Sequence, residues 1–171
     1  SSVRDRQNDA VTRTAWFHCF AGTAGDMTIA ALVDAGADPT MVADVVGRLE
    51  LDGYALTFDE VMRCGLVATQ AHVAFVEDDQ LHHHHDTHHR SYKAIRTLID
   101  TADLPVRVRD RAQRTFAMLA DVEGAMHGVP SDVVEFHEVG SIDAIVDIVG
   151  ACAALESLSV ERIVCSPISV G

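Results

Sequence analysis

Six histidines and four carboxylates crowd into one short polar segment of the chain. The carboxylates are Glu77, Asp78, Asp79 and Asp86, and the histidines are His82, His83, His84, His85, His88 and His89. Neutral imidazole is a good ligand for nickel, zinc and copper, and nearby negative charge concentrates divalent cations. The segment lacks apolar periodicity, so we expect an exposed loop over residues 77–90 that captures a metal for delivery. The alternative is a solvated loop without function or a tag remnant, although a tag normally stands at a terminus.

A second group of polar residues surrounds the start of a very apolar helix predicted near the carboxyl end. Asp143 and Asp147 are four residues apart and share one face, where their charges repel each other. A buried pair of carboxylates needs a cation, a proton or several hydrogen-bond donors. His137 and Glu138, just before the helix, could join the same catalytic site. Alternatively, the two aspartates form the solvent-exposed stripe of the helix.

Small residues form a turn at residues 21–26, between a predicted strand and a predicted helix. Gly22, Thr23 and Gly25 would let backbone N–H groups approach an anion, and the helix dipole favours a phosphate there. Their spacing fits neither a dinucleotide-binding fingerprint nor a phosphate loop. Two interpretations stay open: a nucleotide-phosphate site with Asp26 facing the substrate, or a tight connection in which Asp26 caps the helix.

The remaining histidines and the cysteines give weaker signals. His18 is expected to pack in the core, and His127 is interpreted as structural because it lies at a helix end four residues after Glu123. The sequence has no nucleophile elbow, so nothing supports a nucleophilic triad. The cysteines form no Cys-x-x-Cys pair and are expected to be reduced core thiols; they are Cys19, Cys64, Cys152 and Cys165.

Apolar periodicities predict the elements that position these residues. A buried strand is expected at residues 15–20, a further strand at residues 162–165, and a hairpin over residues 54–75. Helices are expected from Asp26 to Gly36, around residues 42–49, from Ser91 to Ile99, from Pro105 to Gly128, and over residues 141–158. The predicted apolar face of the helix from Pro105 consists of Val108, Ala112, Phe116, Leu119, Val122 and Met126. Because strands and helices are mixed without a regular βαβ repeat, we predict an α+β fold: a small mixed sheet with several packed helices and the exposed histidine-rich loop.

Composition narrows the class of protein. The 171 residues have a formal net charge of -13, which argues against nucleic acid and anionic membranes as partners. No apolar run approaches the roughly 20 residues that cross a bilayer, so we expect a cytoplasmic protein. We expect a flexible amino terminus over residues 1–14 and one domain over residues 15–171, truncated after the last strand. A homo-oligomer is compatible with the sequence.

Four sequence blocks resemble the LarC family of nickel insertion proteins. They are His-Cys-Phe-Ala-Gly-Thr-Ala-Gly-Asp-Met (18–27), Leu-Asp-Gly-Tyr (51–54), the histidine cluster (82–89) and Phe-His-Glu-Val-Gly-Ser-Ile-Asp-Ala-Ile-Val-Asp-Ile-Val-Gly (136–150). Val-Cys-Ser-Pro (164–167) also fits. The resemblance covers nearly the whole chain after Thr14 and implies the amino-terminal part of such a protein.

The resemblance implies a CTP-dependent nickel insertase of the lyase class. Its substrate would be a pyridinium bisthiocarboxylate mononucleotide, and its product the nickel-pincer cofactor of an acceptor enzyme of the lactate racemase type. CTP with Mg or Mn would bind a carboxyl-terminal domain absent from this chain, so the fragment would hold nickel(II) and substrate without completing the reaction.

Three functional hypotheses remain at this stage. The first is insertion of loop-bound nickel into a substrate held near Asp26, His137, Glu138, Asp143 and Asp147. The second is a nickel storage or metallochaperone module without catalytic activity. The third is a metal-dependent hydrolase, which is the weakest because no pattern identifies a water-activating metal centre.

Overall fold

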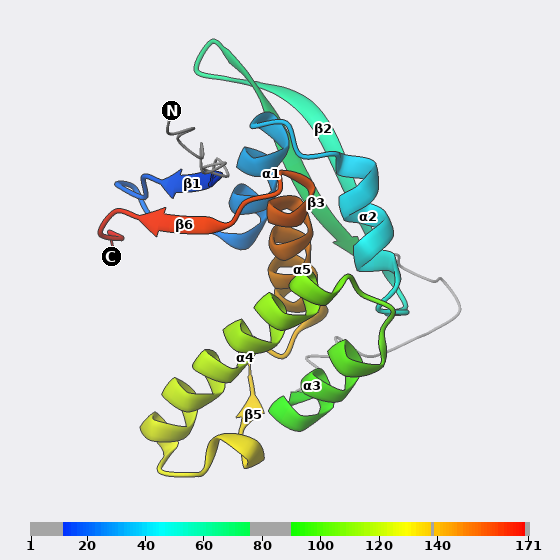
Figure 1. Cartoon of the computed structure of the whole chain (residues 1–171), viewed down its shortest axis with the longest axis vertical. Coiled ribbons are helices and arrows are strands. Elements are labelled where there is room, and N and C mark those ends of the chain that lie inside the picture. Colours follow the sequence, from blue (N-terminus) through cyan, green and yellow to red (C-terminus); the bar gives the residue numbers. More distant parts are fainter. Residues whose placement is uncertain (1–11, 76–89, 138, 170–171) are drawn as a thin grey trace, which may run out of the picture. The chain divides into compact units, whose positions relative to one another are not determined.

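The computed structural model of the chain describes residues 12–75, 90–137 and 139–169. Helices and strands are mixed along it without a regular repeat, which confirms the predicted α+β class (Figure 1). The elements fall into two compact units: Ser1–Gly22 with Ser159–Gly171, and Thr23–Leu158. The predicted flexible terminus lies almost wholly outside the described residues, because the description begins at Thr12 and the first strand at Thr14.

The smaller unit is built on a two-stranded parallel ribbon. Strand β1 (Thr14–Phe17) pairs with β6 (Arg162–Cys165); β6 has the predicted boundaries, whereas β1 ends three residues before the predicted end at residue 20. Trp16 and Phe20 are 66% and 71% exposed, so the prediction of a buried strand over residues 15–20 is wrong. A two-stranded ribbon has too little apolar surface of its own to cover both faces, which accounts for this exposure.

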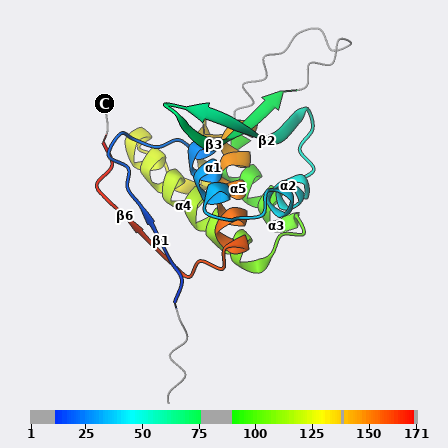
Figure 2. The same ribbon diagram turned by 90° about the horizontal axis from the view of Figure 1, so that it is seen from above.

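The first half of the larger unit consists of two helices and a hairpin. Helix α1 (Gly25–Asp34) is followed by α2 (Pro39–Gly47), whose first turn is capped by the side chain of Asp38. Strands β2 (Tyr54–Arg63) and β3 (Leu66–Phe75) are antiparallel and confirm the predicted hairpin. Strand β3 packs against α1, and Figure 2 shows the hairpin beside this helix.

The second half consists of three helices joined by short segments. The elements are β4 (Arg90–Ser91), α3 (Tyr92–Thr101), α4 (Val106–His127), the 3-10 helix η1 (Ser131–Val133), β5 (Glu135–Phe136) and α5 (Ile142–Ser157). Serine side chains cap α3 and α5 by accepting a backbone N–H, at the positions where the two helices were predicted to start. Gly128 ends α4 in the left-handed conformation, with φ +68°.

Helix α5 is the central element of the larger unit. It packs against α1, α2 and α4, and Figures 1 and 2 show it among these helices. Ile145, Val146 and Val149 are fully buried. Each such side chain contributes about 1.5–3 kcal/mol of hydrophobic stabilisation. The contact of α5 with α4 also includes Arg107, whose Nε lies 3.2 Å from Oε2 of Glu156.

The buried face of α4 differs from the predicted one in its second half. Val108, Ala112 and Phe116 are fully buried as predicted, but Val122 and Met126 are 61% and 76% exposed. The buried face continues instead through the small residues Ala120 and Gly124. Small residues allow neighbouring backbone to approach the helix, which a count of large apolar side chains does not reveal.

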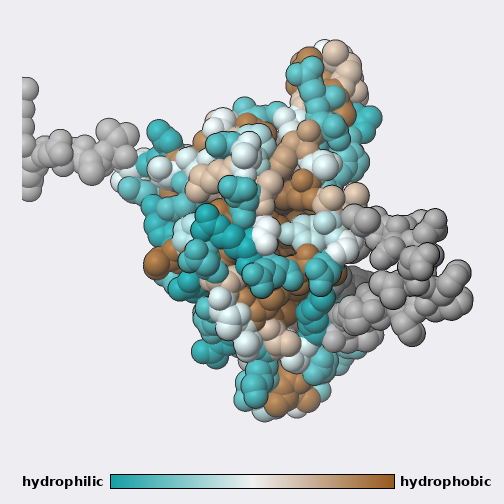
Figure 3. All heavy atoms as spheres, turned by 90° about the vertical axis from the view of Figure 1, so that its right-hand side faces the viewer, coloured by the Kyte–Doolittle hydropathy of each residue, from teal (hydrophilic) through white to brown (hydrophobic). Residues whose placement is uncertain are grey.

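In the described ranges, the strands pair as three two-stranded ribbons, so the finer expectation of one mixed sheet is not met there. One ribbon is parallel and two are antiparallel. The β2–β3 hairpin exposes large apolar side chains at its tip, at the top of Figure 3; they include Met62, Leu66 and Val67. None of the helices in the described ranges has the length and apolar character needed to cross a membrane.

Candidate functional site

Helices α1 and α5 approach each other closely at two glycines. A Cβ atom at Gly25 of α1 would lie 2.5 Å from Cβ and Cγ of Asp147 in α5. A Cβ atom at Gly150 of α5 would lie 2.8 Å from Cδ1 of Ile29 in α1, the end of a side chain that can move aside. Carbon atoms that are not bonded normally stay about 3.5–4.0 Å apart, so Gly25 has no space for a side chain. The two glycines bring the carboxyl group of Asp147 against the first turn of α1.

Asp147 has the clearest chemical signature of the predicted site residues. Its Oδ1 atom is buried and accepts no hydrogen bond from the residues that the structure describes. Burial raises the pKa of Asp147 from 3.8 to about 6, and the charges of Asp143 and Asp26 add to the rise. A hydrogen bond from the backbone N–H of Asp26 opposes it. A carboxyl group with a pKa near 6 exchanges its proton close to neutral pH, which suits general acid–base chemistry.

Asp143 and Asp26 act on Asp147 but are themselves exposed. The expectation that α5 buries both of its aspartates is therefore correct only for the partly buried Asp147. Helix α1 begins at Gly25 rather than at Asp26, and its N-cap, Ala24, makes no side-chain hydrogen bond. As predicted, the side chain of Asp26 still caps a free backbone N–H of the first turn, because its Oδ1 accepts the N–H of Met27 at 2.7 Å.

The small-residue turn gives the predicted phosphate site no further support. Gly22 has φ +85°, and its N–H donates to the carbonyl of Cys19 at 3.2 Å. The hydroxyl of Thr23 lies 3.2 Å from that of Thr28 in α1. Gly25 provides the space for Asp147, whose negative field opposes an anion at this helix end. Binding of a phosphate by Gly22, Thr23 and Gly25 stays a prediction.

His137 lies in a different part of the larger unit, beside the last turn of α4. Its Nδ1 is 3.7 Å from Oε1 of Glu123, and Nε2 of His127 is 3.4 Å from the same oxygen. The sequence interpretation separated His127 from His137. What sequence reasoning missed is that the short segment after α4 turns back on the helix. The available signal was the pair Glu123 and His127, one helical turn apart, followed at once by a glycine stop.

Several predicted residues lie outside the described part of the chain. They are Glu138 and the metal-binding candidates His82, His83, His84, His85, His88 and His89. The histidine-rich loop was predicted to end at residue 90, but Arg90 already belongs to β4. His18, expected in the core, is exposed, and its ring stacks on that of Trp16 with centroids 5.3 Å apart.

The four cysteines are free, as predicted, but only two are buried. Cys19 and Cys152 are buried, whereas Cys64 and Cys165 are exposed, so the expectation of four core thiols is wrong. Burial raises the pKa of Cys152 to about 11 and keeps it a neutral thiol near pH 7.

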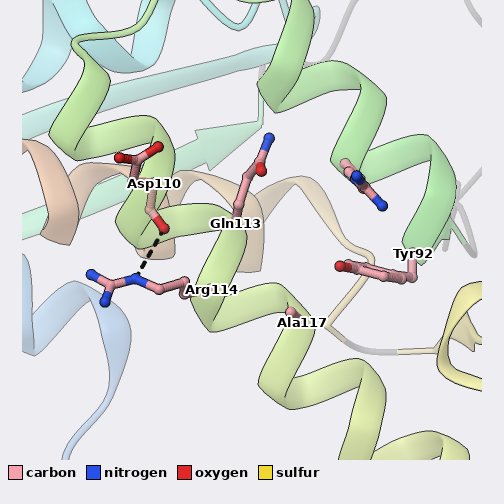
Figure 4. A pocket seen from close by; sticks show the side chains of 6 residues that line it. Tyr92, Asp110, Gln113, Arg114 and Ala117 are labelled. Carbon is pink, nitrogen blue, oxygen red and sulfur yellow. Dashed lines mark hydrogen bonds between the residues drawn. The ribbon is translucent and has the colours of Figure 1, made fainter.

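A pocket opens between α3 and α4, and its lining contains none of the predicted site residues. Tyr92 of α3 and Gln113 of α4 line it together with Arg114 (Figure 4). Nε of Arg114 donates to the carbonyl of Asp110 at 3.3 Å, and the Gln113 amide donates to Asp100. Arg114 and Gln113 thus already have hydrogen-bond partners, and we take the α1–α5 contact and the end of α4 as the candidate sites.

Comparisons with known proteins agree on one family. Residues 15–171 match the family described as "Nickel insertion protein". A "Putative nickel insertion protein" of Geobacter sp. (strain M21) is 44% identical over 159 residues, which are 93% of this chain and 40% of that protein. The "Pyridinium-3,5-bisthiocarboxylic acid mononucleotide nickel insertion protein" of Geobacillus kaustophilus (strain HTA426) is 39% identical over 158 residues, which are 91% of this chain and 38% of that protein.

The chain thus spans about 40% of the length of the curated relatives it matches. No solved structure matches it.

Proposed function

Because the chain belongs to the nickel insertion protein family, the LarC family of the sequence resemblance, we propose that it takes part in inserting nickel into pyridinium-3,5-bisthiocarboxylic acid mononucleotide. Two findings support this proposal. The family match covers residues 15–171, and the relative from Geobacillus kaustophilus is named for this substrate. The product would be the nickel-pincer nucleotide cofactor that lactate racemase-type enzymes accept.

The single structural observation that carries the proposed chemistry is Asp147 with its raised pKa. Insertion of nickel at the pyridinium ring breaks a ring C–H bond, and the electron pair of that bond forms the new C–Ni bond. The proton must pass to a base. We assign this role to the carboxylate of Asp147, because a group with a pKa of about 6 is mostly ionised at pH 7 and still holds a proton better than an ordinary aspartate.

The charges around Asp147 support a cationic substrate at the α1–α5 contact. Asp26 and Asp143 lie close enough to raise the pKa of Asp147, so three carboxylates act on the same space. Such a field attracts a pyridinium ring or a divalent ion and repels a phosphate. We therefore propose that the ring of the substrate, rather than its phosphate, faces Asp147.

The remaining functional assignments are part of the same proposal. The histidines at positions 82–89 would capture nickel, and His137 with Glu138 would contribute to its transfer. CTP with Mg or Mn would bind in the portion of the relatives' length that this chain does not span. The finished cofactor would then pass to an acceptor enzyme.

The proposal is tested by Asp147→Asn in a full-length protein that carries this sequence. Asparagine keeps the size of the side chain but cannot accept the proton. Supplied with nickel, CTP and the pyridinium substrate, the variant should form cofactor at least 100-fold more slowly, while nickel binding stays unchanged. Cofactor is measured by mass spectrometry and by activation of an apo lactate racemase.

A matched control is Asp44→Asn, which makes the same change at an exposed aspartate of the same unit, on α2. It should leave the rate of cofactor formation unchanged. If Asp147→Asn forms cofactor at the normal rate, Asp147 is not the base. If the unaltered full-length protein binds nickel but forms no cofactor, the storage or metallochaperone alternative replaces insertion.

A further inference from the structure

The last turn of α4 and the segment that follows it bring three metal-ligating side chains together. Glu123 and His127 lie one turn apart on α4, and His137 directly follows β5. One ligand atom from each side chain can be chosen so that all three lie within 4.8 Å of one another. The imidazole rings of His127 and His137 have centroids 6.0 Å apart and both lie near Oε1 of Glu123.

Close backbone packing fixes the two halves of this cluster. A Cβ atom at Gly124 would lie 2.7 Å from the carbonyl oxygen of Val129, so only glycine lets the returning segment approach α4 here. The N–H of Val129 donates to the carbonyl of Gly124 at 3.0 Å. The return of the chain beside Glu123 is therefore built into the backbone.

His137 is held in place by its neighbour Phe136. Phe136 is 1% exposed, and its ring lies 6.3 Å from those of Phe116 and Tyr92. Side chains alternate between faces in extended backbone, so anchoring Phe136 in the core directs His137 outward. The side chains of His127 and His137 are 55% and 61% exposed, which leaves the cluster open to ions from solution.

We propose that Glu123, His127 and His137 form a three-ligand site for a divalent transition metal. In a nickel insertion protein this would be a holding site for the nickel cargo, an assignment that rests on the proposed function. Four-coordinate ions with ligands at about 2.0–2.2 Å keep those ligands about 3.4 Å apart. The two contacts of Glu123, at 3.4 and 3.7 Å, already match this spacing. The three ligand atoms lie within 4.8 Å of one another, and both histidine side chains are more than half exposed.

The donor set fits an ion that must enter and leave. Imidazole and carboxylate ligands suit nickel, zinc and copper, and three protein ligands leave coordination positions open for water or for an incoming ligand. A closed site with four protein ligands would retain the ion instead. The cluster therefore has the composition expected of a transfer site.

The cluster is also next to the described end of the histidine-rich range. Arg90 directly follows the six histidines in sequence and pairs in the β4–β5 ribbon with Phe136, the residue before His137. Nη1 of Arg90 also donates to the carbonyl of Gly140 at 3.1 Å. Arg90, the first described residue after the six histidines, is thus paired with the residue that precedes the ligand His137.

Nickel titration separates this site from the histidine-rich segment. In the full 171-residue chain, the histidines at positions 82–89 are all replaced by serine, and NiCl2 is titrated by calorimetry. We expect one nickel ion per chain to remain bound. In this background, Glu123→Gln, His127→Ala and His137→Ala should each weaken nickel binding at least tenfold. His72→Ala, which removes another exposed histidine of the same unit, should leave the affinity unchanged.

Circular dichroism checks that each variant keeps its helices, and Glu123→Gln, which preserves size, is the decisive variant. The absence of a stoichiometric nickel site in the serine background overturns the proposal, as does unchanged affinity in folded Glu123→Gln. Neither result contradicts the proposed insertion reaction. Conversely, tight nickel binding at the cluster without cofactor formation by the full-length protein would contradict insertion but agree with the metal site.

Discussion

The two candidate sites are built in opposite ways. At the α1–α5 contact, Gly25 and Gly150 lie where the two helices approach each other closely. The half-buried Asp147 there has one oxygen without a hydrogen bond from the described residues. At the end of α4, the three side chains lie on the surface and are each at least 28% exposed. At the first site the reactivity depends on the desolvation of Asp147. At the second site metal binding depends on the spacing of the ligand atoms. Substitutions should therefore act mainly on stability and pH dependence at the first site and mainly on metal affinity at the second.

The largest effect is expected from Gly25→Ala. The added methyl group would meet Cβ and Cγ of Asp147 at 2.5 Å, so α1 and α5 must separate. We expect the free energy of unfolding to fall by about 3 kcal/mol, the upper range for overpacking. Urea denaturation measures this loss. Gly47→Ala, where no atom lies within 4 Å, is the control and should be neutral or stabilising by up to about 1 kcal/mol. Equal stability of the two variants would contradict the close approach of α1 and α5.

The second-largest effect is stabilisation by nickel in the variant whose histidines at positions 82–89 are replaced by serine. Ligand that binds only the folded state stabilises it by about 2.7 kcal/mol at a free concentration 100 times the dissociation constant. A thermal melt with nickel should show this rise, and the same melt of Glu123→Gln at that nickel concentration should show no more than about half of it, because tenfold weaker binding leaves about 1.4 kcal/mol. An equal rise in both would place the bound nickel elsewhere.

A smaller effect is expected from Asp147→Asn on the pH dependence of stability. The folded-state pKa of about 6 lies above the ordinary 3.8, so the folded protein binds this proton more tightly. Stability from this group is fully present below about pH 3.8 and is lost as the pH rises to 6. At pH 7–8 the variant should therefore be more stable by about 1–2 kcal/mol, after discounting the shift for solvent screening. Below pH 3.8 the two proteins should unfold alike. A difference independent of pH would point to packing instead.

The smallest effect is expected from His127→Ala without metal. The side chain is 55% exposed, and its contact with Glu123 is a surface contact. Such contacts contribute about 0–1 kcal/mol, so the free energy of unfolding should change by less than about 0.5 kcal/mol. Denaturation in the presence of a chelator measures this. A loss above 2 kcal/mol would mean that the end of α4 is structural rather than a ligand site.

Local patterns were sufficient to predict most of the fold. The apolar run of α5, the serine before it and the alternation in β2 and β3 each depend on residues adjacent in sequence. They were less informative about burial. Trp16 was expected inside because it is large and apolar, whereas its exposure depends on how little surface a two-stranded ribbon can cover.

The candidate sites were predicted only in part, because each depends on a close approach. The aspartates of α5 could be grouped by their spacing of four, but the role of Gly25 against Asp147 required knowing that α1 crosses α5 at that turn. Likewise, Glu123 and His137 are fourteen positions apart, and only the return of the chain over Gly124 brings them together.

The contact between Gly25 and Asp147 also links the evolutionary freedom of the two positions. A larger side chain at position 25 requires a smaller one at position 147, because the two would occupy the same space. A homologue with alanine at position 25 should therefore carry glycine at position 147, because even the Cβ atom of an alanine there would lie 2.5 Å from the added methyl group, and would have given up the acid. Conversely, adding Asp147→Gly to Gly25→Ala should restore part of the lost stability, a rescue that neither substitution could be expected to give alone.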